Sequence, residues 1–385
     1  MFERKVLANM LLSLGLVVLW TSVNCLINYA DYLLKAEMNR KLCLNPPPPC
    51  TCIDRVYSCP LGNSQDEAVI KLNFDNDFIY FECLNVSSFE TFPDLTKNIN
   101  VTGIGISNCL LSINKTLNEL TSKMSKQVKN ITIDILEKEK LTLNKNLFEG
   151  FSMLENLIIK FVLYQPTMSI STNVFEKLIN LKTLVLWCIQ TPNDLFDPLE
   201  YLQVLSIHSK QIKLENGIFK NQRNLIDLNL DCRKYDCTLD PLIFANLTNL
   251  EKLNIKGNFS IHWSENVLKN NEKLKSIQLT NVFSFQFTQT LLTQNKDLKY
   301  VNFNHNQLES LPEHFFKNLS NIDKIILSSN QLTSLSRDLF VDQTMLSELD
   351  LGYNNLTELD DGLFKTTKNM KTLILTSNLL TKVSR

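Results

Sequence analysis

The feature that most constrains this 385-residue chain is a nine-residue pattern, LxxLxLxxN, that recurs along most of its length. It reads LSELDLGYN from Leu346 and MKTLILTSN from Met370, and earlier IDKIILSSN from Ile322 and LKYVNFNHN from Leu298. With any aliphatic residue in the apolar slots, the pattern begins at twelve positions, namely 101, 128, 154, 181, 202, 225, 250, 274, 298, 322, 346 and 370. The last five intervals are all 24 residues, so the chain repeats one structural unit.

The spacing within each copy predicts local structure. Apolar residues alternate with period two, which indicates a short strand with one face turned inward. The ninth residue turns the chain out of the strand, and five copies place asparagine there: Asn258, Asn306, Asn330, Asn354 and Asn378. An inward asparagine bonds backbone groups of neighbouring turns, each bond contributing about 1 kcal/mol net. A helical array is disfavoured because it requires a different apolar period and seldom places asparagine in its core.

A second set of apolar residues closes each turn. In two repeats these are the pairs Leu335 with Leu339 and Leu359 with Leu363. A phenylalanine occupies the next position in successive repeats, as in Phe316, Phe340 and Phe364. No single repeat buries its apolar face, so neighbouring repeats must stack. The predicted fold is an α/β solenoid, a leucine-rich-repeat horseshoe with a concave sheet and a phenylalanine spine.

The stretch before the first repeat is rich in cysteine. Cys43, Cys50, Cys52 and Cys59 precede a strand-like run, AVIKLNFDNDFIYFEC, that ends at Cys83. The first repeat places Cys109 where later copies have asparagine. We expect a disulfide-stapled β-hairpin cap that covers the apolar edge of the first repeat. A zinc site is disfavoured because such clusters belong mostly to reducing compartments.

The amino terminus predicts entry into the secretory pathway. Three charged residues, Glu3 to Lys5, precede an apolar run from Met10 to Trp20, which is short for a membrane span. We therefore assign residues 1–25 to a signal peptide, with cleavage after Cys25 or after Ala30, and keep an uncleaved signal anchor as the alternative. The cysteine-rich cap then takes residues 26–100 and the repeats take 101–385.

The sequons agree with this compartment. We expect N-linked glycans at Asn85, Asn100, Asn114, Asn130, Asn246, Asn318 and Asn355. Asn246 and Asn318 each lie four residues before a repeat begins, in equivalent turns. The sequon at Asn258 should stay unmodified, because a ladder asparagine points inward.

The third, fifth and seventh residues of each copy should face outward on the concave sheet. They are polar in most copies, but three successive copies give an apolar patch with charges and a histidine beside it. The predicted ligand contacts are Ile158, Val185, Trp187, Val204, His208, Asp227, Asp231, Lys252 and Lys256. A chance cluster of surface hydrophobic residues is the alternative to a protein-binding site.

Three further cysteines lie inside the repeats. Cys232 and Cys237 follow one strand core closely, which predicts a local disulfide. Cys188 occupies the equivalent slot two repeats earlier, about 10 Å away, which exceeds the Cα separation of about 7 Å that a disulfide spans. Cys188 is therefore expected to be a free thiol.

Nothing in the sequence indicates catalysis. The four histidines are scattered, no hydrolase, metalloprotease or nucleotide-binding motif is present, and we expect neither an enzyme nor a cofactor or metal site. The formal net charge is −1, which gives no electrostatic case for nucleic acid as a partner.

The order of the cysteines in the cap is more distinctive of a protein family than the repeats are. A cysteine, then CTC, YSCP, a run ending in FEC and a first repeat ending in Cys109 resembles the amino-terminal region of insect Toll receptors, of the Toll-like receptor family. The resemblance implies the ectodomain of a single-pass receptor that binds a secreted cystine-knot cytokine of the Spätzle type. Such a receptor signals through a cytoplasmic TIR domain in innate immunity or development, and dimerisation on the ligand stays open.

The chain departs from that whole, because it carries no second cap, membrane span or TIR domain, so we expect it to be the front part of a longer protein. A secreted leucine-rich-repeat decoy and an adhesion protein remain alternatives. If the protein continues as a full-length receptor, we expect this part to lie on the extracellular side of the plasma membrane. If the chain ends at Arg385, we expect it to be secreted.

The cap also resembles secreted leucine-rich-repeat caps, in which the first cysteine usually pairs with the third and the second with the fourth. That resemblance implies the pairs Cys43–Cys52 and Cys50–Cys59, with Cys83–Cys109 remaining. A free Cys109 thiol in the asparagine ladder is the alternative for that position.

Overall fold

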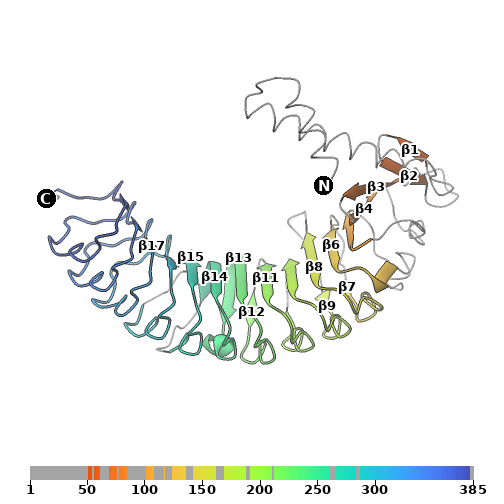
Figure 1. Ribbon diagram of the computed structural model, residues 1–385, viewed down its shortest axis with the longest axis horizontal. Helices are drawn as coiled ribbons and strands as arrows, with labels where there is room; N and C mark the ends of the chain where they lie inside the picture. Colours follow the sequence, from red (N-terminus) through yellow and green to blue (C-terminus); the bar gives the residue numbers. More distant parts are fainter. Residues whose placement is uncertain are drawn as a thin grey trace, which may run out of the picture.

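The computed structural model describes residues 51–53, 56–60, 69–75, 78–84, 101–107, 117, 124–135, 142–161, 169–187, 191–209, 212–260, 266–282 and 287–381. The chain forms an arc whose inner edge is lined by strands, with the repeats following one another from the cap to the carboxy-terminal end (Figure 1). Seventeen strands belong to one continuous sheet.

Twelve parallel strands form the repeat part of this sheet, and each begins two residues after a predicted repeat start. They are β5 (Gly103–Ser107), β6 (Asn130–Ile135), β8 (Asn156–Phe161), β10 (Thr183–Trp187), β11 (Val204–Ser209), β13 (Asp227–Leu239), β14 (Lys252–Ser260), β15 (Ser276–Thr280), β16 (Tyr300–Asn302), β17 (Lys324–Ile326), β18 (Glu348–Asp350) and β19 (Thr372–Ile374). Burial alternates residue by residue along β6, β10, β11 and β15, so the period-two prediction is confirmed in these strands.

The cap consists of antiparallel strands joined to the repeats. The strands β1 (Thr51–Ile53), β2 (Val56–Pro60), β3 (Val69–Asp75) and β4 (Phe78–Leu84) pair in sequence order. The last of them, β4, pairs in parallel with β5 of the first repeat. The cap therefore covers the edge of the first repeat by extending the same sheet.

The side of the arc opposite the sheet is built from turns. The helical elements with described bounds are two short 3₁₀ turns, η1 (Met124–Lys126) and η2 (Pro241–Phe244). Short extra strands, β7 (Thr142–Leu143), β9 (Ser169–Ile170) and β12 (Lys213–Leu214), complete the set. Among the crossing segments with described bounds, the helical part of the α/β expectation consists of these single turns, because those segments are too short for a stable helix.

The predicted asparagine ladder is present in the later repeats. Asn330 donates from Nδ2 to the carbonyl oxygens of Phe303 and Leu327, both at 2.9 Å. Its Oδ1 accepts from the backbone N–H groups of Asn306 at 3.0 Å and Leu308 at 3.1 Å. Equivalent bonds are made by Asn306, Asn354 and Asn378. Each ladder asparagine ties one turn to the turn before it.

The phenylalanine spine is also confirmed. The ring of Phe340 stacks between Phe316, with centroids 5.9 Å apart, and Phe364, with centroids 6.3 Å apart. The same slot holds Phe148, Phe175, Phe196, Phe219 and Phe244, all fully buried, in earlier repeats. The spine lies behind the sheet and forms part of the hydrophobic core between the strands and the turns.

The sequence pattern did not predict a second row of buried side-chain amides. It occupies the slot three residues before a repeat begins, where four other repeats have leucine. The side-chain nitrogens donate to backbone carbonyls of the preceding turn, as in the 2.6 Å bond from Gln343 Nε2 to the carbonyl of Phe316. The row consists of Gln222, Asn271, Asn295 and Gln343. These amides add a second set of bonds between neighbouring turns.

Strands β13 and β14 depart from the regular repeat. Their register shifts between Cys232 and Cys237, and Gly257 takes a φ of 113° opposite Cys232. A Cβ atom at Gly257 would lie 1.8 Å from the carbonyl oxygen of Cys232, so only glycine fits there. The irregularity overturns the ladder prediction for Asn258. Because β14 runs on to Ser260, Asn258 is partly exposed and Phe259 is buried instead.

Candidate functional site

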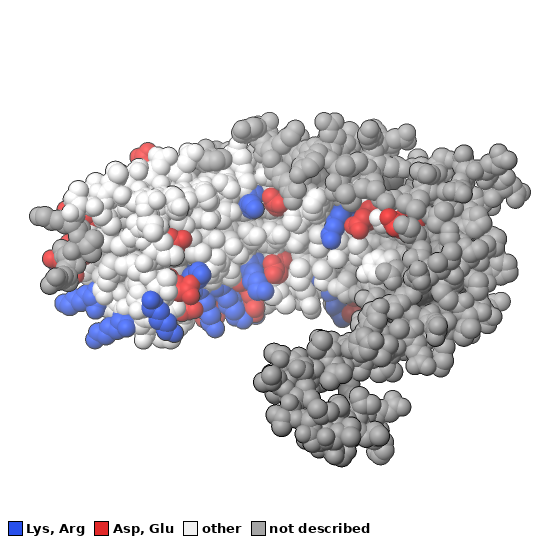
Figure 2. Space-filling model, turned by 90° about the horizontal axis from the view of Figure 1, so that it is seen from above, with Lys and Arg blue, Asp and Glu red and all other residues white. Residues whose placement is uncertain are grey.

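The concave face carries the residues predicted to contact a ligand. In β10 and β11 burial alternates between core and outer positions, so the third, fifth and seventh residues of the repeat face outward. Figure 2 shows this face from above: Lys and Arg side chains lie beside Asp and Glu along one long edge, with uncharged surface next to them.

The four apolar residues of the predicted site lie together. Ile158 on β8 is opposite Val185 on β10 in the strand register, and Trp187 follows two residues later on the same face. Val204 on β11 is opposite Thr183, diagonal to Val185. All four side chains are half-buried. We call Ile158, Val185, Trp187 and Val204 the concave patch.

His208 lies between the concave patch and a carboxylate. Its ring is 5.3 Å from that of Trp187, centroid to centroid, and its Nδ1 is 3.3 Å from Asp231 Oδ2. The His208 and Asp231 side chains are only 19% and 16% exposed. His208 therefore supports the face of Trp187 as well as marking the patch edge.

The predicted charged neighbours lie in two pairs of opposite charge. Lys252 Nζ lies 3.6 Å from Asp227 Oδ2, and Lys256 is opposite Asp231 in the register of β13 and β14. An exposed pair of this kind contributes less than about 1 kcal/mol to stability. It gives the surface beside the concave patch a balanced charge.

The repeat pattern did not predict an aromatic extension of this face at the cap. Phe78 and Tyr80 on β4 stack with ring centroids 4.7 Å apart, and Tyr80 is 44% exposed. Any Cβ on Gly103 or Gly105 of β5 would lie within 2.3 Å of these rings, so the glycines make room for them. The sequence feature that could have indicated these rings is the triplet Gly103-Ile104-Gly105 in the first repeat, because later copies have larger residues at the two glycine positions.

The cysteine predictions have different outcomes. Cys232 and Cys237 form a disulfide with Cα atoms 6.4 Å apart, and the N–H of Ile212 donates to Cys237 Sγ at 3.0 Å. The other cysteine predictions lie outside the described residues or side chains: Cys43, Cys50, Cys52, Cys59, Cys83, Cys109 and Cys188.

The described sequons occupy three settings. Asn246, Asn318 and Asn355 are exposed and lie outside the strands, as an attached glycan requires. Asn130 begins β6 on the concave face, and Asn258 lies within β14. Asn85, Asn100 and Asn114 lie outside the described residues.

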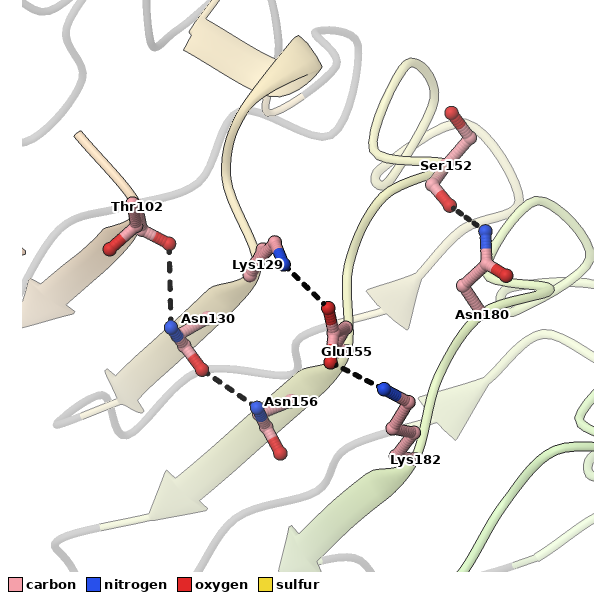
Figure 3. A network of polar contacts seen from close by, with 8 residues as sticks. All are labelled: Thr102, Lys129, Asn130, Ser152, Glu155, Asn156, Asn180 and Lys182. Atoms are coloured by element: carbon pink, nitrogen blue, oxygen red, sulfur yellow. Dashed lines mark hydrogen bonds and ion pairs between the residues drawn. The ribbon is translucent and has the colours of Figure 1, made fainter. Parts of the chain in front are cut away.

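A network on the flank of the arc links three repeats (Figure 3). The Glu155 carboxylate accepts from Lys182 Nζ at 2.7 Å and pairs with Lys129 Nζ at 3.0 Å. Hydrogen bonds from Lys182 and then Lys129 lower the pKa of Glu155 below its usual value. A lowered folded-state pKa stabilises the fold above the unfolded pKa and loses that effect as the pH falls.

We therefore expect Glu155→Gln to reduce the stability of these repeats at pH 7 by at most about 1 kcal/mol. The difference between variant and parent should disappear as the pH falls below about 4.3, the usual value for glutamate, and through the lowered folded-state pKa of Glu155, since the parent carboxyl is then also neutral. Thermal unfolding of both chains over this pH range measures it. Glu176→Gln is the control, because its pair with Lys177 is exposed on both sides. A pH-independent deficit in Glu155→Gln would contradict the assignment.

None of the helices in the described ranges has the length and apolar character needed to span a membrane. Those ranges also hold no group of three or more His, Cys, Asp and Glu residues suited to a metal ion.

Family comparisons identify the repeat. A leucine-rich-repeat model matches residues 296–356 and 344–385, and a BspA-type leucine-rich-repeat model of six copies matches residues 170–292. No curated protein sequence matches the chain.

Solved structures with the same architecture include two receptors. The Toll–Spätzle complex of Drosophila aligns with a TM-score of 0.66 at 22% identity, over 86% of this chain and 48% of that one. The TLR13–ssRNA13 complex aligns with a TM-score of 0.57 at 20% identity, over 72% of this chain and 40% of that one. The chain thus spans about half the length of these proteins or less, and the likeness establishes a shared fold.

Proposed function

We propose that this leucine-rich-repeat chain is the ligand-binding ectodomain region of a Toll-type cell-surface receptor, and that its concave face binds a secreted protein. The ligand class we propose is a cystine-knot cytokine of the Spätzle type, in innate immune or developmental signalling. The proposal places residues 1–25 as a signal peptide and the repeats outside the cell.

The observation that best supports a docking role is the concave patch. It joins an indole, Trp187, to three aliphatic side chains on three neighbouring strands, with the His208–Asp231 contact beside it. Aromatic anchors inside a polar rim are typical of the residues that contribute most to protein binding. Half-buried residues on a rigid sheet also lose little conformational entropy when a partner covers them.

The charge pattern favours a protein over a nucleic acid as the partner. Nucleic-acid binding needs an excess of Lys and Arg that neutralises phosphates. On the concave face Lys252 pairs with Asp227, and Lys324 pairs with Glu348 at 2.6 Å. Paired charges suit a partner that presents both signs.

Likeness of fold to the receptor chain in the Toll–Spätzle complex supports the choice of ligand class. Sequons support the choice of face. Strands β8, β10 and β11, which carry the concave patch, contain no sequon asparagine, whereas Asn246, Asn318 and Asn355 lie outside the strands and Asn258 lies in β14. The strands of the concave patch are therefore free of attached glycans and leave room for a protein.

The test is binding of the secreted, folded chain to a processed Spätzle-type cystine-knot dimer, followed by hydrogen exchange of the complex. We expect saturable binding and slower exchange of amides at β8, β10 and β11, while β17 to β19 stay unchanged. No binding at micromolar concentrations would reject the ligand class. Binding with protection confined to the turn side would reject the concave face.

A further inference from the structure

Asn130 is a sequon asparagine at the start of β6 and faces the concave side. Burial alternates along β6, so Asn130, Thr132 and Asp134 point outward while Ile131 and Ile133 are buried. In the strand register Asn130 is opposite Asn156, and Thr132 is opposite Ile158 of the concave patch. The sequon Asn130-Ile131-Thr132 therefore lies directly beside the proposed docking surface.

The Asn130 side chain is held in place by its neighbours (Figure 3). Its Oδ1 accepts from Asn156 Nδ2 at 2.7 Å, and its Nδ2 donates to the carbonyl oxygen of Thr102 at 3.5 Å. An amide nitrogen carries two hydrogens, and an N-linked sugar replaces one of them. The other hydrogen suffices for the Thr102 contact, so a glycan at Asn130 requires neither bond to break.

We propose that Asn130 carries an N-linked glycan rooted on the concave face, which closes β5 and β6 to macromolecules and marks the cap-side limit of the docking surface. This inference depends on the proposed function in one respect, because N-glycosylation requires that the chain enter the secretory pathway. In the transfer, Nδ2 bonds to the anomeric carbon of an oligosaccharide carried on a lipid pyrophosphate. The bond from that carbon to the pyrophosphate oxygen breaks, the lipid pyrophosphate leaves, and Nδ2 releases one proton.

The distances make such a glycan a barrier. Strands lie about 4.8 Å apart and residues rise about 3.3 Å each, so Asn130 and Ile158, one strand and two residues apart, are separated by about 8 Å. A branched, solvated oligosaccharide is wider than this gap. Because Asn156 and Thr102 fix the amide, the glycan stem has one direction in which to leave the sheet.

Two matched substitutions test the proposal without a ligand. Thr132→Ala removes the sequon and leaves the Asn130 side chain intact, whereas Thr132→Ser keeps the sequon. Glycopeptide mass spectrometry of the secreted chain should find Asn130 modified in the parent and in Thr132→Ser, and unmodified in Thr132→Ala. An unmodified Asn130 in the folded parent overturns the proposal.

Shielding is measured with Asp134→Cys, two residues beyond Thr132 on the same face, and with Thr280→Cys on β15 as a distant control. A polymer-linked maleimide should label Asp134→Cys at least about threefold faster with Thr132→Ala than with Thr132→Ser, since only the bulky glycan differs. A small maleimide, and the Thr280→Cys control, should show equal rates. Equal polymer rates at Asp134→Cys overturn the shielding. Both measurements stand even if the cystine-knot ligand fails to bind.

Discussion

A secreted chain carrying Trp187→Asp with Val204→Asp is expected to bind its protein ligand at least about 100-fold more weakly than the parent. Both side chains belong to the concave patch and are half-buried on rigid strands. Two carboxylates there would each have to be desolvated without a partner when a ligand covers them. The loss should appear mainly as faster dissociation, measured by surface plasmon resonance.

The matched control is Tyr201→Asp with Val341→Asp. These residues are 60% and 41% exposed and lie in turns outside the strands, so the same charges enter away from the concave face. Circular dichroism should show both double variants folded. If the folded Trp187→Asp, Val204→Asp chain keeps the parent affinity, the concave patch is not the docking site.

Phe340→Ala is expected to cost the later repeats about 4 kcal/mol of unfolding free energy. The ring is fully buried and stacks on Phe316 and Phe364, so truncation leaves a cavity and removes two aromatic contacts. Because repeats contact only their neighbours, the loss should be greatest in β17 to β19. Native-state hydrogen exchange measures it strand by strand.

The control for this variant comes from the chain itself. Two repeats carry leucine in the spine slot, Leu268 and Leu292, and both are fully buried. Phe340→Leu should therefore cost less than about 1.5 kcal/mol, because most of the volume is retained. Equal losses in the alanine and leucine variants would argue against a packed spine.

Periodicity made the regular part of this fold predictable. Every strand of the repeats starts where the apolar pattern places it, because alternation along a strand is fixed by backbone geometry. The ladder at Asn330 and the spine at Phe340 follow from residues that recur every 24 positions. The concave patch was predictable for the same reason, since strand register places residues with equal repeat positions side by side.

Departures from the period were not predictable. Asn258 fits the ladder pattern, but the bulge at Gly257 carries the strand past it, and that bulge depends on the disulfide-bonded segment of the neighbouring strand. The buried amides at Gln222 and Gln343 recur in one slot but alternate with leucine, which concealed them among turn residues. Contacts such as His208 with Asp231 depend on rotamers that periodicity does not determine.

The spacing of the bonds between turns has a mechanical consequence. The ladder and amide bonds that connect neighbouring turns join residues 22 to 27 positions apart, about one turn of the solenoid. The Cys232–Cys237 disulfide closes only five positions and so lies within a turn. Because each turn is bonded only to its neighbours, we expect a chain pulled from its ends to lose turns one after another from an end. The Cys232–Cys237 disulfide should not halt this unfolding, since it does not link one turn to the next.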